Sequence, residues 1–128
     1  RFRRWSTRTF RSIMNRADIC LLPISLNPFT ACKTSNRVVT SLTLGVPVVA
    51  DLIPSYEEFV PYILVSNWEQ HLERYASSRE LRQQHVREGQ EFIARRFAPE
   101  AIAEQWTSVF RRVVGEAASS GKSRSGDL

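Results

Sequence analysis

The sequence predicts a protein of the α/β class, with a parallel sheet flanked by helices. Three apolar runs have the length of strands, at residues 18–24, 46–50 and 62–65. They do not alternate with polar residues, which is typical of strands buried on both faces of a parallel sheet. Segments with helical spacing separate the runs, and this alternation favours parallel strand connections.

The composition excludes several other classes. The chain has 128 residues, of which 42% are hydrophobic and 24% are charged, as in an ordinary globular domain. No apolar run approaches the ~18 residues of a membrane span. Two cysteines, Cys20 and Cys32, are too few for a disulfide framework and indicate reduced thiols of a cytoplasmic protein. The sequence starts without Met or a secretory signal, so we expect further sequence upstream of it.

The positive charge is concentrated at the start of the chain. The net charge is +5, and six arginines precede the first acidic residue, Asp18. These six account for the whole net charge, whereas a nucleic-acid-binding protein usually spreads a basic stripe over its fold. We therefore expect no nucleic-acid partner. The arginines suit a solvated or partner-facing side of a helix, and a phosphate-binding patch is the alternative. They are Arg1, Arg3, Arg4, Arg8, Arg11 and Arg16.

The first helix and the loop after the first strand have recognisable boundaries. Ser6 is a suitable N-cap for a helix over residues 7–16, where apolar side chains recur at helical spacing. Residues 25–32, after the first strand, are predicted to form a loop. The reason is that Asn27-Pro28 is a turn signal, and proline restricts the residue before it.

A second helix connects the first two strands. Thr34 or Ser35 is expected to cap its start, and Gly45 stands just after its end, where a glycine commonly adopts a positive φ. Pro47 is tolerated in the second strand because it lies at the beginning of that strand. A short helix from Pro54 then leads to the third strand.

Helices dominate the rest of the sequence. Asn67 is expected to cap a helix around Trp68, and a further helix covers residues 78–96. The last helix begins at Pro99, since proline suits a first-turn position. We expect Trp68 and Trp106 to anchor a core. The apolar face of the last helix has a regular helical period: Ile102, Gln105, Trp106, Val109, Phe110 and Val113.

Composition also suggests how the chain is organised. Residues 1–114 are predicted to belong to one domain, and the small and polar residues 115–128 to a flexible tail. The three strands are all too apolar for sheet edges. We therefore expect them to be the C-terminal part of a wider sheet, whose other strands precede Arg1.

The segment between the first strand and the second helix is the candidate binding site. It follows the carboxyl end of a parallel strand, where ligands of open α/β sheets bind, and it opens a helix whose N–H groups suit phosphate. Lys33 supplies a mobile charge, Arg37 a bidentate fork, and Thr34, Ser35 and Asn36 neutral donors. The alternative is that Thr34 or Ser35 merely caps the helix while the two cations point into solvent.

No other chemistry has a comparable pattern in the sequence. His71 and His85 lie among Glu and Arg on helices, and we expect them to face solvent. No His and Cys pair has zinc spacing, so no metal site is predicted. Cys32 stands beside Lys33 but has no histidine base close in sequence, so it is not expected to be a nucleophile. Catalytic residues therefore stay unassigned.

Three segments together resemble the C-terminal domain of GT-B-type glycosyltransferases. They read ADICLLP from Ala17, KTSNR from Lys33 and LGVPVVA from Leu44. More narrowly, they are similar to the retaining, group 1 glycosyltransferases, in which the strand ending in proline precedes a loop, a helix and a G-x-P-V-V-A strand. The resemblance covers about residues 5–114. It implies two Rossmann-like domains facing across a cleft, with the C-terminal one holding the nucleotide-sugar donor.

The resemblance also implies roles for particular residues. Residues 33–37 would line the donor diphosphate, whereas Asn27, Phe29, Thr30 and Thr40 would lie near the donor sugar or ribose. The nucleotide-sugar is a substrate, and no cofactor or metal is implied. The expected partners are that donor and an N-terminal Rossmann-like domain, toward which the last helix would cross. Peripheral association of the parent protein with a membrane is also compatible with this family.

Two positions depart from the family pattern and leave a second function open. Group 1 glycosyltransferases commonly carry Glu-x7-Glu, whose second Glu contacts the ribose, whereas the corresponding positions here are Cys32 and Thr40. The first hypothesis is the donor-binding region of a glycosyltransferase, inactive without its other domain, which stabilises the leaving diphosphate electrostatically. The alternative is a degenerate, non-catalytic domain acting in protein assembly. An epimerase-like enzyme of the same two-domain shape is a remote third option.

Overall fold

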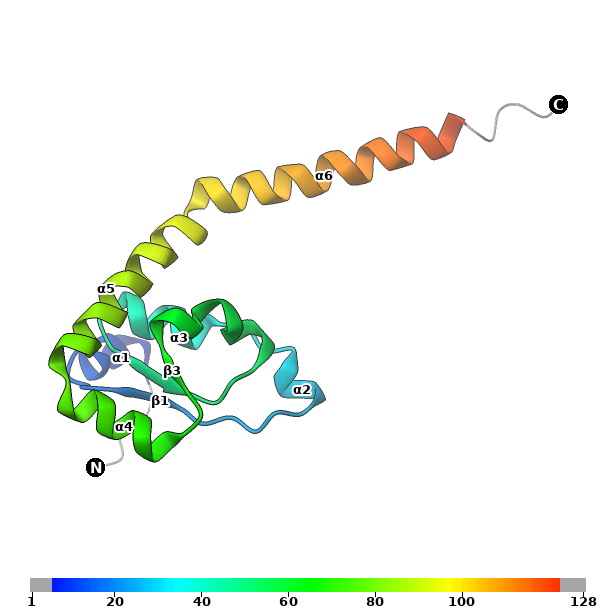
Figure 1. The fold of residues 1–128 in the computed structure, drawn as a ribbon. Helices are drawn as coiled ribbons and strands as arrows, with labels where there is room; N and C mark the ends of the chain where they lie inside the picture. The colour runs from blue at the N-terminus through cyan, green and yellow to red at the C-terminus, as the bar shows by residue number, and fades with distance from the viewer. Residues whose placement is uncertain (1–5, 123–128) are drawn as a thin grey trace. The chain divides into compact units, whose positions relative to one another are not determined.

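The computed structural model describes residues 6–122, and the chain divides into two compact units at Ile93 and Ala94. The division falls inside helix α5 (Arg79–Arg96) rather than after residue 114, where the composition changes. The first unit contains the sheet and the helices around it, and the second contains the last helix (Figure 1). Arg1, Arg3 and Arg4 of the basic N-terminal segment lie outside the described residues.

The first unit is built on a parallel sheet of three strands. These are β1 (Cys20–Leu22), β2 (Val48–Ala50) and β3 (Leu64–Val65), in the order β1-β2-β3. The predicted α/β class, with a parallel sheet flanked by helices, is confirmed. All three residues of β2 are buried, whereas Leu21 in the outer strand β1 is 48% exposed.

Helices cover both faces of this sheet. Helices α1 (Thr7–Met14) and α3 (Asn36–Thr43) contribute to one face, and α4 (Trp68–Ser77) packs with the start of α5 on the other. Figure 1 shows α3 and α4 on opposite sides of the sheet. On the α4 side, a cluster joins the sheet to both helices: Val49, Leu64 and Tyr75 with Ile19, Trp68, Leu72 and Leu81.

The connection from α3 to β2 forms as the sequence predicts. Gly45 has a φ of +81°, the left-handed conformation that glycine adopts without steric cost. Its N–H donates to the Leu42 carbonyl, and the N–H of Val46 donates to the Ser41 carbonyl, each at 2.9 Å. This pair of bonds is a Schellman motif, which satisfies the last carbonyls of α3 and turns the chain into β2.

A short helix replaces part of the predicted loop between β1 and α3. Helix α2 (Pro28–Ala31) begins after Asn27, whose side-chain oxygen accepts hydrogen bonds from the N–H groups of Phe29 and Thr30 at 3.0 Å. The expectation of a loop over residues 25–32 was therefore wrong at α2. Asn27-Pro28 acts here as an N-cap followed by proline at N1, rather than as a turn.

The remaining elements of the first unit differ from the predictions in detail. The segment η1 (Pro54–Tyr62) before β3 is a 3-10 helix. Ser6, Ser35 and Asn67 occupy the predicted N-cap positions of α1, α3 and α4, but their side chains make no capping hydrogen bond. Asn67 has a positive φ of 39°, a left-handed conformation instead of the extended one that is typical of an N-cap.

The second unit consists mainly of one helix, α6 (Pro99–Lys122). It begins at Pro99 as predicted, but it continues through Gly115 to Lys122, where we expected a flexible tail. The rest of that predicted tail, residues 123–128, lies outside the described residues. Trp106 was wrongly expected to anchor a core, since its side chain is 59% exposed and stacks on Phe110. The described part of this unit has no second layer to pack on this face.

The structure also bears on membrane insertion. Over residues 6–122, no helix combines the length and the apolar character needed to cross a bilayer.

Candidate binding site

A pocket of about 510 Å³ lies between α1, β1 and α3 on one face of the sheet. It reaches the first turn of α3, which follows the carboxyl end of β1, as the site predicted from the sequence does. Its lining residues come from all three elements: Phe10, Met14, Cys20, Leu22, Asn36, Arg37, Thr40 and Ser41.

The pocket has one apolar side and one polar side. Cys20 and Leu22 point into it from β1, because alternate residues of a strand share a face, and Phe10 and Met14 of α1 add apolar surface. The polar groups come from α3, on which Arg37 supplies the cation. A ligand with a flat or apolar body and an anionic end would match both sides.

The charge of Arg37 is available to a ligand. Its guanidinium has no hydrogen-bond or ion-pair partner among the described residues, and its side chain is exposed. Its charge also acts on Tyr56, which lies in η1. Burial raises the pKa of the Tyr56 hydroxyl, and the Arg37 charge opposes part of that rise. The positive charge of Arg37 therefore acts on its surroundings in the first unit without being neutralised by a described carboxylate.

The first turn of α3 also keeps its backbone donors. Ser35 precedes the helix, but its side chain makes no capping hydrogen bond. The first N–H to be bonded within the helix is that of Val39, which donates to the Ser35 carbonyl at 3.0 Å. The alternative in which Ser35 merely caps the helix thus lacks its hydrogen bond. The N–H groups of the exposed residues Asn36 and Arg37 can meet an anion, whereas Val38 is fully buried.

Only part of the predicted phosphate-binding segment, residues 33–37, lines the pocket. Asn36 and Arg37 line the pocket, whereas Lys33, Thr34 and Ser35 do not. The Lys33 ammonium lies 5.2 Å from the centre of the Phe29 ring, a cation–π contact. Lys33 is half-buried and Thr34 is exposed.

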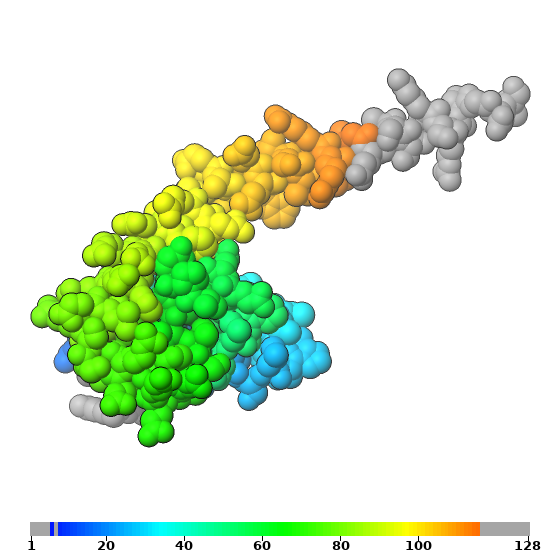
Figure 2. All heavy atoms as spheres, viewed as in Figure 1, coloured from blue at the N-terminus to red at the C-terminus, as the bar shows by residue number. Residues whose placement is uncertain are grey.

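Of the four residues predicted near the sugar or ribose, Thr40 alone lines this pocket. The Asn27 and Thr30 side chains make hydrogen bonds within and just before α2. The Thr30 hydroxyl donates to the Ser25 carbonyl at 2.7 Å and accepts from the Asn27 N–H at 2.8 Å, and Thr30 is only 7% exposed. Phe29 is 75% exposed at the surface of the α2 region, blue in Figure 2.

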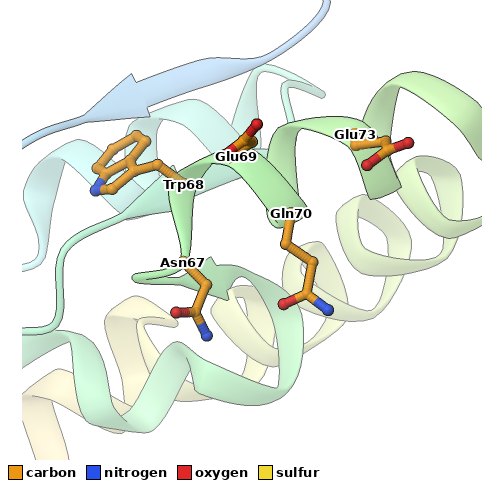
Figure 3. Close-up of a pocket in the computed structure, with 5 residues that line it drawn as sticks. All are labelled: Asn67, Trp68, Glu69, Gln70 and Glu73. Carbon is orange, nitrogen blue, oxygen red and sulfur yellow. The ribbon is translucent and has the colours of Figure 1, made fainter.

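Two other hollows lie away from the site that the sequence predicts. One of about 490 Å³ lies at the start of α4, and Figure 3 shows its lining residues, with Asn67 and Gln70 on one side of the helix and Trp68 on the other. Two of its lining side chains, Glu69 and Glu73, are carboxylates, which repel an anion. The other, of about 230 Å³, is lined by Arg79 and Arg82 together with Asp18, but it lies before β2, away from the carboxyl ends of the strands.

Asp51 is the residue of this region that sequence reasoning missed. It follows the end of β2, and one carboxylate oxygen accepts a hydrogen bond from the backbone N–H of Ile24 at 2.8 Å. The other accepts from the Trp68 indole N–H, also at 2.8 Å. An acidic residue directly after a buried parallel strand was the signal available in the sequence.

The two histidines do not face solvent freely, contrary to the prediction. The His85 ring bonds to the Tyr75 hydroxyl at 2.8 Å, and the His71 ring bonds to the Ser66 carbonyl at 2.8 Å. Both side chains are half-buried. The described residues contain no group of three or more His, Cys, Asp and Glu side chains that could hold a metal ion.

The fold and this pocket together define an α/β protein with a cationic pocket at the first turn of a helix that follows a parallel strand. No protein-family model, curated protein or solved structure matches the chain. The function is therefore argued from the pocket itself.

Proposed function

We propose that the chain is the donor-binding region of a GT-B-type glycosyltransferase, in which the pocket beside α3 receives the nucleoside diphosphate of an activated sugar. The observation that carries the proposal is the unpaired Arg37 guanidinium beside the uncapped first turn of α3. A guanidinium and free backbone N–H groups are the two donor types that bind phosphate oxygens best in proteins.

The apolar and polar sides of the pocket support the same proposal. The apolar side formed by Phe10, Met14 and Cys20 offers a surface for a nucleobase, and Thr40 offers a hydroxyl to the ribose. In sugar transfer, negative charge grows on the leaving diphosphate as the glycosidic bond breaks. Arg37 and the helix N-terminus stabilise that charge, and Lys33 joins them once its ammonium leaves the Phe29 ring.

Calorimetric titration of the chain with UDP, GDP and ADP tests this proposal. We expect at least one of them to bind, and Arg37→Ala to raise its Kd about tenfold, the cost of one charge-assisted contact. Arg87→Ala, an exposed arginine of α5, is the matched control and should leave the Kd unchanged. If none of the three nucleotides binds, or if both variants weaken binding equally, the proposal is wrong.

A non-catalytic role in protein assembly is the second candidate. It is favoured by Cys32 and Thr40, since neither can supply the carboxylate that commonly contacts the ribose in group 1 glycosyltransferases. Sugar transfer by the parent protein from a purified donor would dismiss this candidate. Nucleotide-sugar interconversion without any acceptor would instead indicate the epimerase-like enzyme.

A further inference from the structure

One carboxylate joins the segments that follow all three strands of the sheet. Asp51 directly follows β2 and accepts from Ile24, which follows β1, and from Trp68, which begins the helix after β3. Its own N–H donates to the Leu22 carbonyl at 3.3 Å. The register places Leu22 beside Ala50 and Ala50 beside Val65, so the three strand ends lie together at this edge.

The chemistry of the position favours an aspartate. Both partners of the side chain are N–H donors, and an ionised carboxylate is an acceptor at both oxygens. An asparagine keeps one acceptor and turns an NH2 group toward the other donor. The Ile24 N–H stands where the ladder of β1 has ended, so the carboxylate replaces a strand as its partner.

A chain of hydrogen bonds leads from Asp51 to the phosphate segment. Next to Ile24, the Ser25 carbonyl accepts from the Thr30 hydroxyl at 2.7 Å and from the Asn27 amide at 3.3 Å. The Thr30 carbonyl in turn accepts from the Lys33 N–H at 3.1 Å. Lys33 lies just before the first turn of α3, so the path of this segment depends on where Ile24 is held.

We propose that Asp51 is a positioning residue for the phosphate site. It contacts no ligand, but it fixes the segment from Ile24 to Lys33, which leads into α3, and so sets where Lys33 and the first turn of α3 meet an anion. The inference rests on the proposed function for its ligand. Such supporting residues act by holding the contacting groups in the productive geometry.

Asp51→Asn and Trp68→Phe separate positioning from general stability. Each variant breaks or weakens the hydrogen bond between Asp51 and Trp68, but only Asp51→Asn also weakens the bond to Ile24, because it replaces a charged acceptor with a neutral amide. Phenylalanine keeps the packing of Trp68 against the core cluster. Both variants should therefore lower the melting temperature, and only Asp51→Asn should disturb the segment from Ile24 to Lys33.

Two measurements on the chain decide the question. Hydrogen exchange of the Ile24 to Lys33 amides should become faster in Asp51→Asn and remain unchanged in Trp68→Phe. The Kd for inorganic pyrophosphate should rise about tenfold in Asp51→Asn and stay at the wild-type value in Trp68→Phe. Equal effects of the two variants on both measurements, or unchanged exchange in Asp51→Asn, would overturn the role of Asp51. A wild-type chain that binds no pyrophosphate would count against the proposed function instead, and the exchange measurement would then decide alone whether Asp51 holds the segment.

Discussion

Arg37 and Lys33 differ in how readily their charges meet a ligand. The Lys33 ammonium rests over the Phe29 ring, a contact worth roughly 0.5–1 kcal/mol at an exposed site, and it must give up that contact to reach a phosphate. The Arg37 guanidinium has no partner to give up among the described residues. Arg37 also offers a planar pair of donors, which a lysine cannot do. We therefore expect Arg37 to contribute more to binding than Lys33.

His85 makes the stability of the first unit depend on pH. Burial lowers the pKa of His85 below its ordinary 6.5, an effect that Arg74 increases and Glu88 opposes. Burial raises the pKa of its partner Tyr75, so the hydroxyl keeps its proton and forms its hydrogen bond with the neutral ring. The unfolded chain therefore binds the His85 proton at a higher pH than the folded chain does. The contribution of neutral His85 to the free energy of unfolding is fully present above pH 6.5. It is lost on acidification, until His85 in the folded chain is also protonated.

Urea unfolding at a series of pH values from about 7.5 to about 5 measures this dependence. His85→Gln keeps a polar side chain beside Tyr75 but cannot titrate, so its free energy of unfolding should fall less over this range than that of the wild type. An unchanged slope in His85→Gln would contradict the assignment.

At the scale of elements, Gly89 sets how closely α5 approaches its neighbours. A Cβ atom at this position would lie 2.9 Å from Leu42 Cδ1 and 3.3 Å from Tyr62 Cβ, and Leu42 is fully buried. Alanine gains about 1 kcal/mol of helix propensity over glycine, whereas overpacking a core costs about 1–3 kcal/mol. Gly89→Ala should therefore lower the free energy of unfolding, by about 1 kcal/mol.

Gly115 in α6 provides the matched control for this substitution. No atom lies within 4 Å of the Cβ that alanine would add there. Gly115→Ala should therefore show the propensity gain alone, as increased helical circular dichroism with no loss in the urea midpoint. If Gly89→Ala stabilised the chain as well, the close packing of α5 on α3 and η1 would be refuted.

Elements with a strong local signal were predictable from the sequence. The unbroken apolar runs gave the three strands, and Gly45 after an apolar helix gave the end of α3. Helix α2 was missed because Asn27-Pro28 favours both a turn and a helix start, and a helix this short has too few residues for a period. Local patterns therefore locate the elements, but they do not determine whether a capping side chain forms its hydrogen bond.

The candidate site was predictable only in part, because its geometry depends on contacts distant in sequence. The phosphate segment was found from its polar residues after a strand, but Arg37 and Lys33 turned out to lie in different surroundings. The role of Asp51 depends on partners 27 and 17 residues away in the sequence. No periodicity records such distances, so the sequence signals an acidic residue after β2 but not the two partners of its carboxylate.

At the scale of the whole molecule, the two units bury their tryptophans differently. Trp68 packs in the core cluster of the first unit and donates to Asp51. Trp106 in α6 stacks on Phe110, with ring centres 5.7 Å apart, and stays mostly exposed. The apolar face of α6 thus has a clear helical period in the sequence, although Trp106 and Phe110 on it are each 59% exposed.

A matched pair of tryptophan substitutions tests whether this division holds in solution. Trp68→Ala should lower the free energy of unfolding by about 3 kcal/mol, because it empties a core position and leaves the Asp51 carboxylate without one donor. Trp106→Ala should change it by less than about 0.5 kcal/mol, as at other exposed positions. Urea unfolding at two protein concentrations measures both variants.

A cost for Trp106→Ala as large as that for Trp68→Ala would mean that the face of α6 is covered in solution. Dependence of that cost on protein concentration would identify the cover as a second copy of the chain.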